Sequence, residues 1–147
     1  MTLQTRGPPD RESVAKGRRA SDVLASAPLV CVVDDDEQVQ KRLEAAIRTL
    51  DIRVEVFPSA EEFLESTQCD QADCLIAEVK LPGISGIELL RRLHDAAADC
   101  PVILITNERD TSTAVKAVLL GAFDLIEKPL TNHLILNRVA LALHLVP

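Results

Sequence analysis

Five short apolar runs alternate along the chain with five segments whose apolar residues recur at helical spacing. Three of the runs are almost continuously apolar, which is typical of strands covered on both faces of a parallel sheet. The run at 52–57 alternates instead, as a half-exposed strand does. Right-handed crossovers between parallel strands place helices on both faces of the sheet. We therefore predict a doubly wound α/β fold with strands at residues 29–33, 52–57, 73–78, 101–106 and 123–127.

The helical segments begin and end at recognisable residues. Asp35 or Asp36 is placed to cap the first helix, and Ser59 to cap a short acidic helix after the second strand. Gly121 follows the helix expected at residues 111–120, as a glycine often follows a helix end. These signals set the elements in the order β-α five times over.

The last helix is more apolar than one buried face requires. Thr131 or Asn132 caps it, and it is apolar on nearly every side from Val139 to Val146. Apolar surface beyond the needs of the core indicates a protein contact. We expect self-association, or docking to an output partner, through this helix with the helix 111–120 and the strand 123–127.

Length and composition fit one folded domain after a short tail. The chain has 147 residues, and 47% are hydrophobic, enough for one ordinary core. Residues 1–28 contain Gly7-Pro8-Pro9, alternating charges and no sustained period. We expect a disordered tail at 1–28, in which a weak helix at 11–25 is an open alternative, and a domain at 29–147.

The charge balance argues against direct nucleic-acid binding. The chain carries 16 basic and 23 acidic side chains, of which five and three lie in the first 28 residues, so the remainder has a net charge of −9. Phosphate backbones bind basic surfaces. There is no Trp or Tyr and there are three Phe residues, so a flavin or a base would find few aromatic rings on which to stack.

Cysteine spacing and hydropathy indicate a cytoplasmic protein. The four cysteines are scattered without zinc-type spacing, and we expect reduced thiols. No segment resembles a signal peptide or a membrane span, because the early apolar run at 29–33 leads directly into aspartates. We therefore expect no membrane association.

Polar residues follow the strands at the points where their carboxyl ends meet. Asp34-Asp35-Asp36-Glu37 follows the first strand, and helix capping explains one or two of these acids. A further crowded carboxylate favours a cation, and oxygen ligands favour Mg²⁺. Glu78, Thr106 and Lys128 end three other strands. Each alone is an ordinary strand-end residue, but together they suit a phosphoryl group, with Glu78 as the nucleophile.

These motifs resemble a known family over about residues 29–145. The segments VVDDDE, LPGISG, VILIT and GAFDLIEKP, in this order, are similar to the receiver domain of bacterial two-component response regulators, most of all to receivers of nitrogen-fixation-type transcription regulators. The resemblance implies a flavodoxin-like (βα)5 fold with strand order 2-1-3-4-5. It also implies Mg²⁺, and a sensor histidine kinase or a phosphotransfer protein as partner.

The resemblance assigns a role to each matching residue. Asp34 and Asp35 are the acidic pair, with Asp35 the direct Mg²⁺ ligand, and Lys80 offers its backbone carbonyl to the metal. Glu78 completes the metal ligands. Thr106 is the switch hydroxyl, and the lysine before a cis peptide bond is that of Lys128-Pro129.

Three positions depart from the family pattern. Glu78 stands where the family has its phosphoacceptor Asp, Asn107 replaces a small residue after Thr106, and Leu125 replaces an aromatic switch residue. The extra methylene of Glu78 displaces its carboxylate by roughly 1 to 1.5 Å, which costs on the order of 100-fold where in-line attack is required. We expect weak Mg²⁺ binding and phosphorylation that is impaired or mimicked, with output by protein contact and no enzymatic turnover of a separate substrate.

Two other functions remain open from the sequence. A degenerate receiver would act only as a binding module. A haloacid-dehalogenase-like phosphohydrolase would use Asp34 and Asp36, Thr106 and Lys128, but that family needs a late acidic pair, and no Asp or Glu follows Glu127. A flavin-binding protein is disfavoured by the scarcity of aromatic residues.

Overall fold

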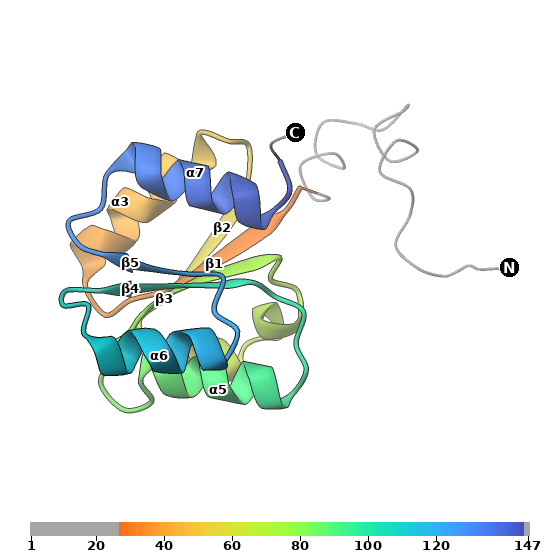
Figure 1. Cartoon of the computed structure of the whole chain (residues 1–147). Helices are drawn as coiled ribbons and strands as arrows, with labels where there is room; N and C mark the ends of the chain where they lie inside the picture. The colour runs from red at the N-terminus through yellow and green to blue at the C-terminus, as the bar shows by residue number, and fades with distance from the viewer. Residues whose placement is uncertain (1–26, 146–147) are drawn as a thin grey trace, which may run out of the picture.

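The computed structural model describes residues 27–145, which form a parallel sheet between two layers of helices (Figure 1). The strand order is β2-β1-β3-β4-β5, and all four strand pairs are parallel. The predicted doubly wound fold with order 2-1-3-4-5 is therefore confirmed. The strands are β1 (Leu29–Val33), β2 (Arg53–Phe57), β3 (Cys74–Glu78), β4 (Val102–Thr106) and β5 (Asp124–Glu127).

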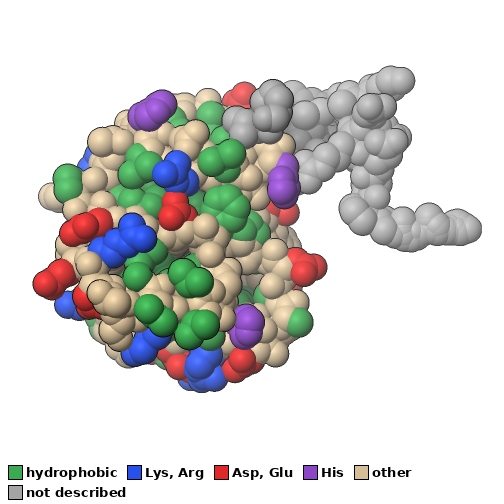
Figure 2. All heavy atoms as spheres, in the orientation of Figure 1, with side chains coloured by type: hydrophobic (Ala, Val, Ile, Leu, Met, Phe, Trp, Pro, Cys, Tyr) green, Lys and Arg blue, Asp and Glu red, His purple; other side chains and the backbone are tan. Residues whose placement is uncertain are grey.

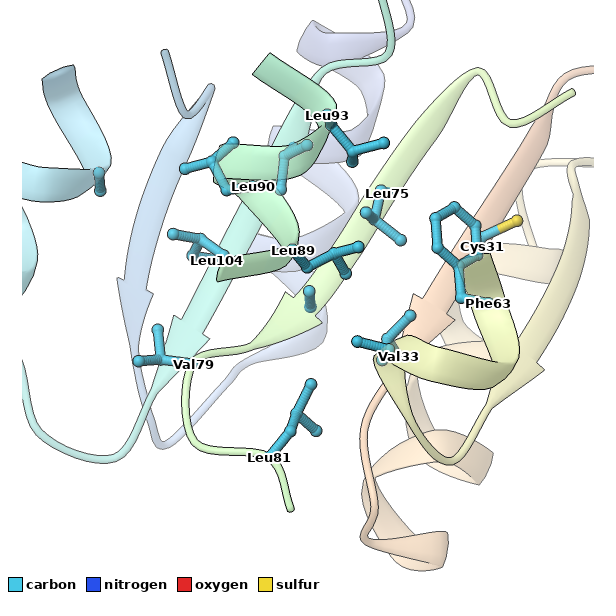
Figure 3. Packing of buried hydrophobic residues seen from close by; sticks show 14 of the residues in the cluster. Cys31, Val33, Phe63, Leu75, Val79, Leu81, Leu89, Leu90, Leu93 and Leu104 are labelled. Carbon is cyan, nitrogen blue, oxygen red and sulfur yellow. The ribbon is translucent and has the colours of Figure 1, made fainter. Parts of the chain in front are cut away.

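Alternate residues of the strands build two separate cores. One face carries α3 and α7, and the other carries α4, α5 and α6. In the second layer Phe63 of α4 lies beside Cys31 of β1, and Leu89 of α5 lies near Leu75 of β3 (Figure 3). The helices are α3 (Glu37–Arg48), α4 (Ala60–Glu65), α5 (Gly86–Asp95), α6 (Thr111–Leu119) and α7 (Asn132–Ala142), with a short 3-10 helix, η1 (Thr67–Asp70).

Side-chain caps fix the beginnings of the helices that the sequence predicted. Asp36 accepts from the backbone N–H of Gln38, Ser59 from that of Glu62, and Thr131 from that of Leu134. Each bond satisfies a backbone donor that the first helical turn leaves free. Of the two candidate caps for the first helix, Asp36 is the residue used, and of those for the last helix it is Thr131.

The last helix is shorter than the apolar segment from which it was predicted. α7 ends at Ala142, and Leu141 and Leu145 are 40% and 48% exposed, so neither is a buried core residue. The expected tail at 1–28 and its possible helix at 11–25 lie almost wholly outside the described residues, as does Val146.

Two further sequence expectations concern the environment of the domain. All four cysteines, Cys31, Cys69, Cys74 and Cys100, are free thiols. Burial raises the pKa of Cys31 to about 12, with smaller contributions from nearby acidic groups. Within residues 27–145, no helix combines the length and the apolar character needed to cross a bilayer.

Candidate phosphoryl site at the carboxyl edge of the sheet

Three polar residues are buried among the described residues, and all lie where a strand meets the carboxyl edge of the sheet. Asp34 follows β1, Glu78 ends β3 and Thr106 ends β4, and these residues are 1%, 5% and 2% exposed. Parallel strands bring their carboxyl ends to one edge, which is where open α/β sheets bind ligands. The fold therefore gathers three of the residues that the sequence predicted.

Lys128 joins this group from the end of β5. Its Nζ donates to Oε1 of Glu78 at 2.7 Å, and its backbone N–H donates to the carbonyl of Thr106 at 2.8 Å. The Lys128-Pro129 peptide bond is cis, as the family resemblance implied. The side chain of Lys128 is only 19% exposed, so the pair with Glu78 is shielded from water.

Both carboxylate oxygens of Glu78 have partners within the chain. Oε1 binds Lys128, and Oε2 accepts from the backbone N–H of Val79 at 3.1 Å. The carboxylate is thus held between a cation and a main-chain donor. Glu78 thus binds Lys128, but it makes no hydrogen bond to Thr106.

Asp34 is the less satisfied of the two buried acids. Oδ1 accepts from the backbone N–H of Asp36 at 2.9 Å, whereas Oδ2 is buried without a hydrogen bond and lies 3.8 Å from Nζ of Lys128. Burial raises the pKa of Asp34, and the charges of Glu78 and Asp35 add to this; the Asp36 N–H and Lys128 oppose it. A cation beside Oδ2 would offset the cost of burying this carboxylate.

Lys128 is the counter-charge for both acids. Burial lowers the pKa of Lys128, but the hydrogen bond and the charge of Glu78, with those of Asp34 and Asp36, outweigh burial and raise it overall. One lysine therefore balances two buried carboxylates, and it lies closer to Glu78.

The Thr106 hydroxyl is engaged in its own loop. It donates to the carbonyl of Glu108 at 2.9 Å and accepts from the backbone N–H of the same residue at 3.2 Å. Asn107, beside it, is exposed, and Leu125 is buried at 6% exposure. The hydroxyl would have to leave Glu108 before it donated to a phosphoryl oxygen.

Asp35, the other carboxylate among the predicted ligands, forms no metal-holding group with the buried acids. Asp35 is exposed, and so is Lys80, whose backbone carbonyl is the last predicted ligand. In the part of the chain that the structure describes, no three His, Cys, Asp or Glu side chains form a group that could hold a metal ion. Oδ2 of Asp34 suits a cation, but Oε1 of Glu78 already binds one, the Lys128 ammonium. As they lie, these residues do not form a complete Mg²⁺ site.

The comparisons with known proteins agree with the geometry of this edge. Residues 30–140 match the family model described as the response regulator receiver domain. The chain belongs to the response regulator receiver family. Receiver domains typically bind Mg²⁺ at their phosphorylation site.

Relatives of this receiver include several bacterial response regulators. The response regulator protein TodT of Pseudomonas putida is 34% identical over 121 residues, covering 82% of this chain and 53% of TodT. The transcriptional regulatory protein FixJ of Azorhizobium caulinodans is 36% identical over 114 residues, covering 78% of this chain and 54% of FixJ. The chain thus spans about half the length of these relatives.

A solved structure shows the same receiver fold. The crystal structure of FixJ-N superposes with a TM-score of 0.71 at 33% identity, covering 83% of this chain and 98% of that one. The predicted resemblance to receivers of the nitrogen-fixation type is therefore confirmed at the level of the family.

Sequence reasoning did not find the residues that hold the site in place. Gln40 donates from Nε2 to the carbonyl of Asp34, and Arg42 donates to the carbonyl of Leu130, two residues after Lys128. Gln40 and Arg42 lie in α3 at positions that read as solvated helix surface. Their partners are backbone carbonyls, six and 88 residues away in the chain, which every residue type carries, so residue type and spacing carry no sign of the contact.

Proposed function

We propose that this receiver works in two-component signalling with impaired or mimicked phosphorylation, because Glu78 stands at the phosphoacceptor position. The observation that carries the proposal is the buried 2.7 Å pair between Glu78 and Lys128. A phosphoryl group on a receiver would need Lys128 as its counter-charge, and here the Glu78 carboxylate is already bound to that lysine. The Glu78 side chain therefore competes with the group that it would have to accept.

The mimicry is partial for reasons of charge and shape. A carboxylate is planar with a charge near −1, whereas a phosphoryl group carries about −1.5 to −2 and three acceptor oxygens. Glu78 uses one oxygen for Lys128 and the other for the Val79 N–H. Glu78 makes no hydrogen bond to Thr106, whose hydroxyl stays on Glu108. We therefore expect half of the phosphorylated arrangement to be reproduced: the lysine contact without the threonine contact.

Output would pass through the face formed by α6, β5 and α7. Val115, Val118 and Leu119 of α6 are 49%, 76% and 72% exposed and, with Ala114 and Thr111, line an apolar hollow of about 360 Å³. Figure 2 shows hydrophobic side chains gathered over α6. A patch of this kind marks a protein contact. We propose a second copy of the chain, or an output partner, as its occupant.

The remaining partners follow from charge and family. A sensor histidine kinase or a phosphotransfer protein in the cytoplasm would be the phosphoryl donor, and Mg²⁺ would bind weakly through Asp34, Asp35, Glu78 and the Lys80 carbonyl. Direct nucleic-acid or membrane contact by this domain is not proposed, because residues 29–147 have a net charge of −9. The domain would not act as an enzyme on a separate substrate.

Phosphoryl uptake tests the proposal. Glu78→Asp, in Mg²⁺ with acetyl phosphate or a cognate histidine kinase, should label at least on the order of 100-fold faster than the wild type, because the acceptor regains its reach. Asn107→Ala added to Glu78→Asp should label faster still, since Asn107 lies beside Thr106 at the donor's entry. Intact-protein mass spectrometry measures both.

Two outcomes would overturn parts of the proposal. Ready labelling of the wild type would contradict the geometric argument. If Glu78→Asp and the double variant remain folded and unlabelled, the domain is a degenerate receiver that acts only as a binding module. Circular dichroism confirms folding in each variant.

A further inference from the structure

The loop that leaves β3 is closed at its base and lies directly against Glu78. The backbone N–H of Gly86 donates to the carbonyl of Val79 at 2.9 Å. A Cβ on Gly86 would lie only 2.2 Å from the carbonyl oxygen of Glu78, so the start of α5 touches the main chain of the site. Leu81 of this loop is 8% exposed and points into the core (Figure 3). A shift of this loop would therefore displace the backbone of Glu78.

The far end of this loop is held by a side chain from another helix. Glu61 of α4 accepts the backbone N–H of Ile84 through Oε2 at 3.0 Å. Gly83 has a φ of +75°, and a Cβ there would lie 2.1 Å from the same Oε2. The loop thus turns in a left-handed conformation around a carboxylate that is 23 residues earlier in the chain.

Glu61 is committed to this contact. Its other oxygen, Oε1, is buried without a hydrogen bond, so this atom is shielded from water beside the loop. The Ile84 N–H lowers the pKa of Glu61, and this keeps it in the charged form that accepts the bond most strongly. The neighbouring Glu62 is exposed and has no contact of this kind with the loop.

We propose that Glu61 is a positioning residue of the phosphoryl site, which it serves by fixing the loop of residues 79–86 against Glu78. The role presupposes the phosphoryl site proposed above. It also links α4 to that site, because a movement of α4 would pass through Glu61 to the loop and then to the Glu78 main chain. The carboxylate of Glu78 keeps its place between Lys128 and the Val79 N–H only while this loop is held.

Nuclear magnetic resonance of the full chain tests the role without phosphorylation. In Glu61→Ala, amide hydrogen exchange at Ile84 should accelerate at least about tenfold, because its acceptor is gone. The side-chain carboxyl ¹³C resonance of Glu78 should move in the same variant. Glu61→Gln keeps an acceptor oxygen and should restore both, and Glu62→Ala, the matched control on the same helix, should change neither.

A second variant guards against a misfolded Glu61→Ala. Gly83→Ala disturbs the contact from the loop side and should move the same Glu78 resonance with Glu61 intact. An unmoved Glu78 resonance in both variants, beside accelerated exchange at Ile84, would overturn the proposal and leave Glu61 as a local brace of the loop. Failure of Glu78→Asp to take up phosphoryl would instead count against the proposed function, whatever this experiment shows.

Discussion

The carboxyl edge of the sheet and the outer face of α6 use their side chains in opposite ways. At the edge, Asp34, Glu78 and Thr106 are polar and buried, and most of their polar atoms have partners within the chain. On α6, Val118 and Leu119 are apolar, and each is more than two-thirds exposed. The edge is largely satisfied by its own chain, whereas nothing among residues 27–145 covers the apolar face of α6.

This difference suggests how a receiver with an occupied site would still signal. A buried charge without a partner is costly, so the Glu78 and Lys128 pair holds one arrangement of the edge. Exposed apolar surface gains free energy when a partner covers it. In our proposal the edge sets the state of the domain, and α6 presents that state to a partner.

Removing Lys128 should have the largest effect on stability, since it breaks the ion pair with Glu78 at the edge of the sheet. Lys128→Ala leaves two buried carboxylates without a cation, and we expect the free energy of unfolding to fall by about 3 kcal/mol at neutral pH. Urea denaturation measures the loss. Lys116→Ala, at an exposed lysine of α6, is the matched control and should change it by less than about 0.5 kcal/mol.

The pairing is supported further if the loss in Lys128→Ala depends on Glu78. Glu78→Gln in the Lys128→Ala background should recover part of the lost stability, because it removes one uncompensated charge. A Lys128→Ala variant as stable as the wild type would mean that the edge is not held by this pair.

Charging the α6 face should have a smaller effect on stability and a clear effect on association. We expect the wild type to sediment as a dimer at high concentration. Val118→Lys with Leu119→Lys should weaken self-association at least about tenfold, because two charges would enter an apolar contact. A strictly monomeric wild type at high concentration would remove self-association and leave a different partner as the occupant of this face.

The smallest of the expected effects is the change in Mg²⁺ affinity between the wild type and Glu78→Asp. Because Glu78 is bound to Lys128 and Asp35 is exposed, we expect weak binding, with Glu78→Asp tighter than the wild type. Titration calorimetry or Mn²⁺ relaxation measures the affinity. Micromolar binding by the wild type would show that the acids converge on the metal despite the lysine pair.

The fold was predictable because each element carries a local signal. The apolar runs of β1, β3 and β4 are buried on both faces, and Asp36, Ser59 and Thr131 cap the helices where their residue types suggested. Lys128 and Glu78 were also expected to meet, because the carboxyl ends of parallel strands share one edge.

The contacts made by side-chain reach were not predictable. The Thr106 hydroxyl binds Glu108 rather than facing Glu78, and Glu61 leaves α4 to hold the loop at Ile84. Both depend on rotamers and loop paths that residue type and spacing do not encode. Glu61 and Glu62 are neighbouring residues of the same type, and only the tertiary structure shows that Glu61 reaches the loop.

The pKa of Lys128 tests the central claim, which is that the Glu78 carboxylate is paired with the lysine of the site. It can be followed through the Nζ resonance by nuclear magnetic resonance in the wild type and in Glu78→Gln. A raised pKa means that the stability from the pair is complete below the ordinary pKa of lysine and is lost as the pH rises through the raised value. We predict a raised pKa in the wild type and a clearly lower one in Glu78→Gln. The same Lys128 pKa in both proteins would contradict the account.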